Sequence, residues 1–322
     1  MSGAGEAVAA AVAAAHAEIR SDRAGETIKI YPALAAVPPD LFGLAFVSAG
    51  GRIDAAGDAG HPFSLMSVSK PFVFALLCDA IGGAAARAEI GINATGLPFN
   101  ALAAIENGRE GRTNPMVNAG AIAASSHVPG ADLEAKWRFI QAGIERFAGR
   151  PLAIDDAVYR SASLTNTRNK ALGMLLATFE RLGTDPVEAV ELYTRQCALT
   201  VTARDLAAMG ATLGLGGIQP LTGATAVSAA ACRDVLAAMT TAGLYETSGD
   251  WLFEVGLPGK SGISGGIVAV APGIGGLGTF GPRLDGAGNS VKGQRAARYL
   301  ADRLGLSLFS PAPSLSENAR SS

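Results

Sequence analysis

The segment 63–81, FSLMSVSKPFVFALLCDAI, constrains the fold most because it places two reactive side chains at the start of an apolar helical run. Ser67 and Lys70 stand three positions apart, so a helix would bring both onto one face. Pro71 suits the first turn of a helix and not its interior, which predicts that the pair lies at the helix N-terminus. If burial lowers its pKa, Lys70 can take the proton of Ser67, and the helix end favours the developing negative charge.

A second motif, Lys260-Ser261-Gly262, lies far downstream, just before a segment that we predict to be a strand. Serine acyl-transfer enzymes of the β-lactamase and penicillin-binding type combine an S-x-x-K helix with a K-[ST]-G strand beside it. Lys260 alone would be expected to be a solvated surface charge, and a lone S-x-x-K often arises by chance. Together, the two motifs predict an acyl-transfer site between a helix and a sheet.

Composition argues against several other functions. With 26 Lys and Arg against 28 Asp and Glu, and no dense basic run, the sequence predicts no binding of nucleic acid or of an acidic membrane. The 3 His and 3 Cys residues form no cluster at ligand spacing, so we predict no metal site. The G-x-G-x-x-G match at 273–278 leads into TFGP and not into a helix, so we expect a hairpin turn there and no cofactor.

The alanine-rich N-terminus is predicted to be a helix and not an export signal, because it lacks a basic start and contains Glu6. No run of about eighteen apolar residues follows, so we predict no membrane span. Cys78, Cys197 and Cys232 are widely spaced in apolar or helical contexts, which suits reduced cysteines. We therefore expect a cytoplasmic protein.

Strand signals occur towards both ends of the chain, and helical periodicity dominates between them. Gly50-Gly51 separates two short apolar runs and predicts a β-hairpin. The predicted strands are 43–48, 52–56, 265–271 and 276–280, and a closing helix is expected at 291–304. These elements predict an α+β fold in which helices flank an antiparallel sheet built from both chain ends.

We divide the chain accordingly. Residues 1–308 are predicted to form a single catalytic domain, and the Ser-, Pro- and Asn-rich residues 309–322 a disordered tail. Within the domain, a helical lobe at about 68–240 is inserted between the two parts of a sheet lobe, at about 25–66 and 245–304.

Five segments resemble the serine-dependent glutaminases. They are SVSKPF at 67–72, NPMVNAGAI at 114–122, RNKA at 168–171, YTRQCAL at 193–199 and AGLYETSGDWLFEVGLPGKSGISGGIVAVAPG at 242–273. The resemblance covers about residues 25–300, with the segments in the order and spacing of that family. It implies a β-lactamase-like fold and hydrolysis of glutamine to glutamate and ammonia through an acyl-enzyme. It also implies a homodimer or homotetramer.

The resemblance further implies a role for each matching residue. Ser67 would be the nucleophile, Lys70 its base, and Tyr245 a second proton carrier that helps ammonia leave. The backbone amides of Ser67 and Ile263 would form the oxyanion hole, where the family usually has valine at the second position. Losing one such donor typically costs about 2.7–4 kcal/mol of barrier.

Three more residues would bind the substrate. Tyr193 would border the nucleophile and the substrate amide, and Asn118 and Asn169 would hold the amino-acid end. Out of context, a tyrosine is more often a half-buried packing group and an asparagine a turn or cap residue. These roles therefore depend on the resemblance.

The sequence departs from the family pattern around the expected substrate pocket. The family's glutamate seven positions before Asn169, which would pair with the substrate α-ammonium, is Ala162 here. Met66 replaces a glutamine before the nucleophile, and Ile30-Tyr31 stands where the family has tyrosine followed by isoleucine. Losing a hydrogen bond to a charged group costs roughly 1.5–3 kcal/mol, so glutamine turnover could fall about ten- to over a hundredfold.

These departures leave two hypotheses open at the level of substrate. In the first, the chain is an ordinary glutaminase in which Ser161, Ser163 or a nearby carboxylate replaces the lost contact, with Tyr31 replacing the displaced tyrosine. In the second, it hydrolyses a different primary amide that lacks a free α-ammonium. Two other classes are a β-lactamase or D,D-peptidase, which would require export, and an inactive binding module, which the intact Ser-Lys-Tyr residues disfavour.

Overall fold

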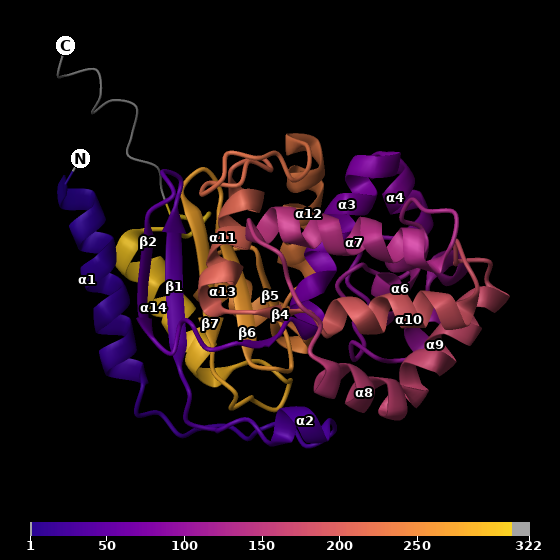
Figure 1. The fold of residues 1–322 in the computed structure, drawn as a ribbon, viewed down its shortest axis with the longest axis horizontal. Helices are drawn as coiled ribbons and strands as arrows, with labels where there is room; N and C mark the ends of the chain where they lie inside the picture. Colours follow the sequence, from indigo (N-terminus) through magenta and orange to yellow (C-terminus); the bar gives the residue numbers. More distant parts are fainter. Residues whose placement is uncertain (1, 311–322) are drawn as a thin grey trace, which may run out of the picture.

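The computed structural model describes residues 2–310, with a sheet and its covering helices in one half and a group of helices in the other (Figure 1). Apart from its first two residues, the tail predicted at 309–322 lies outside this range. The sheet is assembled from both ends of the chain, as the sequence predicted, and its strand order is β2-β1-β7-β6-β5. All neighbouring strands are antiparallel.

The strands lie close to their predicted positions. Their bounds are β1 Gly43–Ser48, β2 Ile53–Gly57, β5 Gly259–Ser261, β6 Gly266–Ala271 and β7 Gly275–Phe280. The hairpin around Gly50-Gly51 is confirmed, and the G-x-G-x-x-G match at 273–278 spans the end of the turn after β6 and the first four residues of β7. Lys260-Ser261-Gly262 lies just before β6, as predicted, and its first two residues also belong to the short strand β5, where Lys260 pairs with Val268 of β6.

Helices cover both faces of the sheet (Figure 1). α1 (Ser2–Ile19) and α14 (Val291–Leu304) share an apolar core with one face. α11 (Ala203–Gly214) packs very closely against the other face. A Cβ added at Gly276 or Gly278 of β7 would come within 2.1 Å of the α11 backbone. Only glycine permits this close approach, which joins the sheet to the helical half.

The helical half is organised around α3 (Ser69–Ile81), in which every residue from Ser69 to Cys78 is buried. A core cluster of buried side chains surrounds this helix, so its N-terminus is a rigid platform. The other helical elements are α2 Pro32–Ala35, η1 Met66–Val68, α4 Gly83–Ile90, α5 Ala103–Glu106, η2 Arg109–Gly111, α6 Asn118–Ser126, α7 Leu133–Ala148, α8 Asp156–Thr165, α9 Thr167–Thr178, α10 Pro186–Cys197, α12 Ala229–Ala242, η3 Tyr245–Thr247 and α13 Ser248–Glu254. A small second sheet pairs β3 (Phe63–Ser64) with β4 (Thr200–Val201) beside η1.

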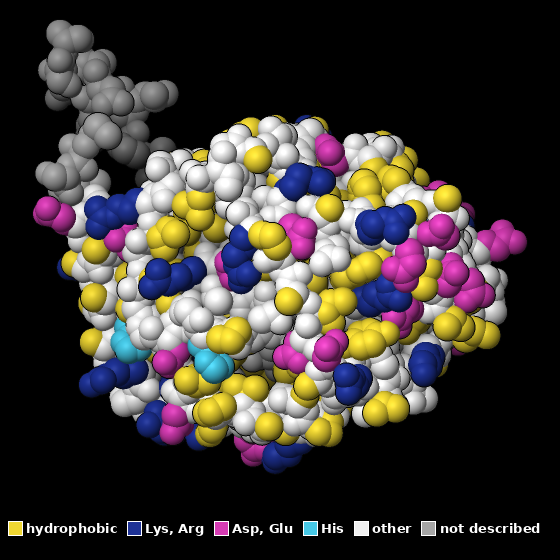
Figure 2. Space-filling model, viewed as in Figure 1, with side chains coloured by type: hydrophobic (Ala, Val, Ile, Leu, Met, Phe, Trp, Pro, Cys, Tyr) yellow, Lys and Arg dark blue, Asp and Glu magenta, His cyan; other side chains and the backbone are white. Residues whose placement is uncertain are grey.

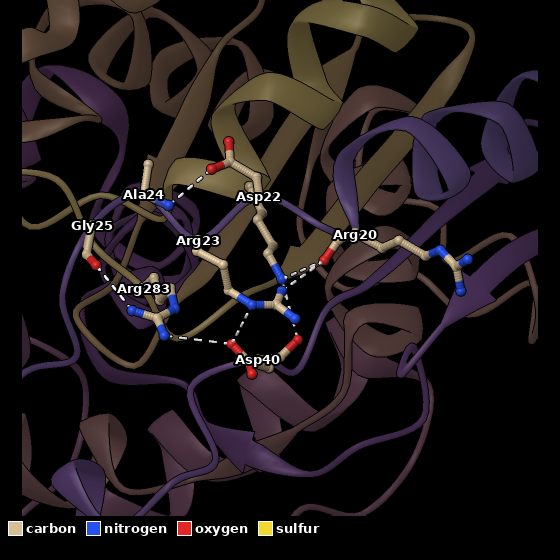
Figure 3. Close-up of polar contacts among 8 residues, drawn as sticks. Arg20, Asp22, Arg23, Ala24, Gly25, Asp40 and Arg283 are labelled. Carbon is tan, nitrogen blue, oxygen red and sulfur yellow. Dashed lines mark hydrogen bonds and ion pairs between the residues drawn. The ribbon is translucent and has the colours of Figure 1, made fainter.

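An ionic cluster of Arg23, Asp40 and Arg283 holds the two ends of the segment 23–40, which leads from α1 to β1 (Figure 3). The Asp40 carboxylate lies 3.2 Å from Arg23 Nε and 3.4 Å from Arg283 Nη2. Lys292 Nζ also donates to the backbone oxygen of Asp40 at 3.1 Å. The cluster therefore closes the segment 23–40, which carries α2, onto the sheet half of the molecule.

The surface carries mixed charge. On the face drawn in Figure 2, Lys and Arg side chains are interspersed with Asp and Glu, and no continuous basic area forms. Some of these charges pair, as Arg150 Nη2 does with Asp205 Oδ2 at 2.6 Å. Within residues 2–310, no helix has the length and apolar character needed to cross a bilayer.

Candidate active site

Ser67 lies in a short 3-10 turn, η1, that leads directly into α3. The predicted helix N-terminus is confirmed, with Lys70 and Pro71 in the first turn of α3. Met66 adopts a φ of +46°, which is rare for a residue with a side chain. Such strain persists only where the surrounding packing imposes it, and both Met66 and Ser67 are buried. The turn therefore holds Ser67 rigidly.

Lys70 is a buried lysine with an exposed fraction of 1%. Its Nζ donates to Asn118 Oδ1 at 2.7 Å and lies 5.7 Å from the centre of the Tyr193 ring. Burial lowers the pKa of Lys70 to about 7, and Cys197 acts weakly in the opposite direction. A large fraction of Lys70 is therefore neutral at neutral pH and has a lone pair that can accept a proton.

Two buried tyrosines flank Ser67. Tyr193 of α10 donates its hydroxyl to Asn118 Oδ1 at 3.1 Å, and Tyr245 of η3 donates to the Ser261 oxygen at 3.4 Å. Burial raises the pKa of both phenols, while a side-chain contact with Ser67 acts in the opposite direction on each. Both phenols therefore keep their protons at neutral pH.

Lys260 lies against the ring of Tyr245, with its Nζ 4.3 Å from the ring centre. The same Nζ donates to the backbone oxygens of Gly243 at 2.8 Å and Ser261 at 2.7 Å. Burial lowers its pKa well below the usual lysine value, and the nearby charge of Lys70 adds to this effect. The solvated position expected for Lys260 alone is wrong, because all of β5 is buried.

Three buried asparagine amides form a hydrogen-bonded row that starts at Lys70. Asn118 Nδ2 donates to Asn169 Oδ1 at 2.9 Å, and Asn169 Nδ2 donates to Asn166 Oδ1 at 2.6 Å. Asn166 Nδ2 then donates to Thr194 Oγ1 at 2.7 Å. The structure therefore brings together the two asparagines named in the sequence analysis and adds Asn166 and Thr194 beside them.

The turn that follows β5 lies against the nucleophile. A Cβ added at Gly262 would lie 3.4 Å from the Ser67 nitrogen and 3.1 Å from Val68 Cγ2, so the two backbones are adjacent. The Ile263 N–H has no acceptor within the described part of the chain. Ser67 and Ile263 also line the same cavity. The two residues that the resemblance names as oxyanion donors are therefore neighbours.

A cavity of about 40 Å³ opens at Ser67. The residues that line it are Tyr31, Met66, Ser67, Phe99, Asn118, Ala162, Asn166, Asn169, Tyr193, Thr194, Cys197 and Ile263. Tyr31 thus reaches the cavity, whereas Ile30 is 65% exposed. Ser161 and Ser163 do not line it, and their hydroxyls are buried without a partner among the described residues.

Comparison with known proteins identifies the family. The family model described as Glutaminase matches residues 25–309. Glutaminase 2 of Yersinia pestis is 55% identical to this chain over 97% of its length and 92% of that protein. The chain belongs to the glutaminase family. The Glutaminase of Brucella suis biovar 1 (strain 1330) is a further relative of this glutaminase, at 46% identity over 96% of this chain and 98% of that protein.

Solved structures with the same fold are also named glutaminases. The probable glutaminase ybaS has a TM-score of 0.93 and 40% identity, covering 95% of this chain and 99% of that one. The probable glutaminase from Bacillus subtilis, complexed with 6-diazo-5-oxo-L-norleucine, has a TM-score of 0.85 and 30% identity, covering 94% and 96%. The predicted family and the predicted α+β, β-lactamase-like fold are thus confirmed.

Sequence reasoning missed four residues that line the cavity of this glutaminase: Phe99, Asn166, Thr194 and Cys197. Asn166 could have been found, because it lies one helical turn after Ala162 and three positions before Asn169. Thr194 and Cys197 belong to the segment YTRQCAL, which carried part of the resemblance. Phe99 gave no local signal.

Proposed function

We propose that this glutaminase hydrolyses L-glutamine to L-glutamate and ammonia through an acyl-enzyme on Ser67. The observation that carries the proposal is a buried lysine in the turn that follows a buried serine, with the lysine pKa lowered to about 7. A neutral Lys70 can take the hydroxyl proton as Ser67 attacks the amide carbon. Ordinary surface lysines are protonated at neutral pH and lack this capacity.

Acylation begins when Ser67 Oγ bonds to the side-chain carbonyl carbon of glutamine and its proton passes to Lys70 Nζ. The backbone N–H groups of Ser67 and Ile263 then stabilise the oxyanion. The C–N bond breaks as the leaving nitrogen takes a proton from the Tyr245 phenol, which Lys70 in turn reprotonates. Ammonia leaves, and the γ-glutamyl group remains on Ser67.

Deacylation repeats these steps with water as the nucleophile. A water molecule gives a proton to neutral Lys70 while its oxygen bonds to the acyl carbon. The ester bond to Ser67 breaks, and Ser67 Oγ recovers a proton. Glutamate is released with Ser67 and Lys70 in their starting states, so the cycle consumes only glutamine and water.

Tyr193, Asn118 and Asn169 position the substrate in this proposal. Their side chains are buried around the cavity and bonded to one another, so their orientation is fixed before substrate enters. Amide hydrogens of the two asparagines face the α-carboxylate end, and Tyr193 borders the reacting amide. Preorganised groups of this kind lower the entropic cost of reaching the transition state.

Ammonia release from L-glutamine tests the proposal. Ser67→Ala is expected to abolish release, whereas the matched control Ser264→Ala removes another buried hydroxyl and is expected to keep it. With hydroxylamine present, the native protein should also form the γ-glutamyl hydroxamate, because hydroxylamine intercepts an acyl-enzyme. Release that survives in Ser67→Ala would refute the proposed nucleophile.

We also infer a cytoplasmic location and a homodimer or homotetramer. The three cysteines are free and buried, which supports a reducing compartment. Exposed apolar side chains such as Leu164, at 85%, and Phe253, at 94%, support self-association. Light scattering should give a mass of two or four chains, and a monomer at micromolar concentration would contradict the second inference.

A further inference from the structure

The wall of the cavity formed by α8 and α9 consists of neutral groups. Ala162, Asn166 and Asn169 form it, and no Asp or Glu within residues 2–310 lines any part of the cavity. No carboxylate contributes to the altered pKa of Lys70 or Lys260 either. A cation bound in this cavity would therefore have no protein carboxylate as a partner.

The amide row offers more free donors than free acceptors. Each amide nitrogen carries two hydrogens and uses one within the row, so one N–H remains on each of the three residues. Asn118 Oδ1 already accepts from Lys70 and Tyr193, which fills both of its lone pairs. The oxygens of Asn169 and Asn166 each accept once and keep one lone pair. With three free N–H groups and two free lone pairs, the row therefore suits a carboxylate beside one or two neutral donors.

An α-ammonium matches this inventory less well than a neutral nitrogen does, because it brings a full positive charge and three N–H donors. Burying such a charge without a partner is costly, whereas one acceptor such as Asn166 Oδ1 satisfies an amide N–H. Building on the proposed function, we propose that this glutaminase, besides hydrolysing L-glutamine, hydrolyses glutamine whose α-nitrogen is uncharged at least as efficiently, with N-acyl-L-glutamine as the substrate class. The α-carboxylate lies on the free amide N–H groups, and Asn166 is the specificity residue.

Space for an acyl group exists beyond the same wall. A second cavity of about 380 Å³ lies between α8, α9 and α10. Asn166 and Thr194 line both cavities, so their hydrogen bond lies at the boundary between them. The lining of the second cavity combines the apolar side chains of Met174, Pro186, Val187 and Val190 with polar residues, among them the charged Lys170 and Glu191. An acyl substituent on the α-nitrogen would extend towards this boundary and meet an environment that suits it.

Ammonia release from three substrates tests the inference in the native protein. The substrates are L-glutamine, N-acetyl-L-glutamine and 4-carbamoylbutanoate, which lacks the α-nitrogen. We expect kcat/KM for the two compounds without an α-ammonium to equal or exceed that for L-glutamine. A value for N-acetyl-L-glutamine below that of L-glutamine would overturn the inference. Ser67→Ala separates the two proposals, because its residual activity tests the nucleophile whatever the substrate preference.

Asn166→Asp places a carboxylate on the wall with almost no change in shape. It should raise the ratio of kcat/KM for L-glutamine to that for N-acetyl-L-glutamine by about tenfold or more, since a charged partner then meets the α-ammonium. Asn107→Asp is the matched control, because Asn107 is exposed and lines neither of the two cavities. An unchanged ratio in Asn166→Asp would count against the role of this residue.

Ligand-induced thermal stabilisation of the native protein gives a reading that needs no variant. At equal concentrations, N-acetyl-L-glutamate should raise Tm more than L-glutamate does, because the ligand that binds the folded state more tightly stabilises it more. An equal or larger shift with L-glutamate would contradict the inference while leaving the catalytic role of Ser67 untouched.

Discussion

Lys70 and Lys260 are equally buried, with exposed fractions of 1% and 0%, but their ammonium groups have different partners. Lys70 Nζ donates to one side-chain amide, that of Asn118, at 2.7 Å. Lys260 Nζ donates to two backbone oxygens and lies against the Tyr245 ring. Burial lowers the pKa of both lysines. The burial of a lysine therefore does not show which of the two is the base.

The partners distinguish the two roles. Among residues 2–310, Lys70 Nζ has a single hydrogen-bond partner, and Lys70 stands in the turn after Ser67, so its lone pair can receive the serine proton. Lys260 is held between the oxygens of Gly243 and Ser261, and Ser261 also accepts from Tyr245. We therefore expect Lys70 to move protons and Lys260 to position Tyr245.

The largest effect is expected for Lys70→Met, which keeps the length of the side chain and removes the amine. General-base catalysis contributes about 10²–10⁴-fold, so kcat/KM should fall by about 10³-fold. The folded state should be retained, because an apolar side chain suits this buried position. The loss is measured by ammonia release, and thermal unfolding checks the fold. A loss of less than about tenfold in a folded protein would assign the base to another group.

Lys260→Met should give a smaller loss of kcat/KM, about ten- to a hundredfold, because Tyr245 would be less well positioned. The pH at which kcat/KM rises should not change, because Lys70 itself is still present. The free energy of unfolding should fall by about 1–3 kcal/mol, because the buried backbone oxygens of Gly243 and Ser261 each lose the N–H donor that Lys260 supplies. A shift in the pH profile would instead show that Lys260 takes part in proton transfer.

Lys292→Met is the matched control for that prediction. Lys292 is also buried, and its Nζ donates to the backbone oxygens of Arg20 at 2.9 Å and Asp40 at 3.1 Å, 5.6 Å from the centre of the Phe42 ring. It does not line the Ser67 cavity. The variant should lose a similar amount of stability, while kcat/KM should fall by no more than about two- to threefold through the segment that carries Tyr31. A ten- to hundredfold loss would show that the effect of Lys260→Met is not specific to Lys260.

Asn118→Asp tests the comparison of Lys70 with Lys260 by placing a carboxylate where the amide of Asn118 accepts from Lys70. Because the base must be neutral, kcat/KM should rise with pH through about 7 in the native protein. A carboxylate beside Nζ favours the protonated lysine, so the rise should move to higher pH by about one unit or more. The pH profile of kcat/KM measures the shift, with Cys197 as the other titratable group that acts on the pKa of Lys70. An unmoved profile would show that Lys70 is not the titrating base.

The lowered pKa of Lys70 also makes the free energy of unfolding depend on pH. The direction of this dependence follows from whether the folded or the unfolded chain binds the Lys70 proton. Between about 7 and the ordinary value of 10.5, the unfolded chain binds the Lys70 proton and the folded chain does not. The contribution of Lys70 to the free energy of unfolding therefore increases as the pH rises through this window. It is smallest below pH 7, where the folded state must hold a buried ammonium.

The sequence predicted those parts of the molecule that local patterns determine. Gly50-Gly51 between two apolar runs specifies a hairpin, and Pro71 after Lys70 specifies a helix start. The family resemblance also predicted that Asn118 and Asn169 both contact the substrate, and both residues line the cavity. Each of these depends on residues close in sequence or on a recognised motif.

Features that depend on packing between distant segments could not be predicted in this way. The ring of Phe99 lies 4.5 Å from that of Tyr245, although the two are far apart in sequence. The burial of Lys260 depends on the Gly243 turn, and the strands β3 and β4 are too short to show a periodicity. In each case, the partner that determines the environment is invisible to local sequence patterns.

The smallest effect is expected where a side-chain contact can be lost without disturbing a lysine. Asp40→Asn weakens the contacts of the carboxylate with Arg23 and Arg283, but Lys292 Nζ still donates to the backbone oxygen of residue 40. Half-exposed ion pairs contribute about 0–1 kcal/mol, so stability should change by less than about 1 kcal/mol. KM should rise about two- to threefold, because the segment that brings Tyr31 to the cavity is less firmly closed. If Asp40→Asn lowered kcat/KM at pH 7 more than Asn118→Asp does, this would contradict the distinction between Lys70, which a side chain holds, and the lysines that backbone oxygens hold.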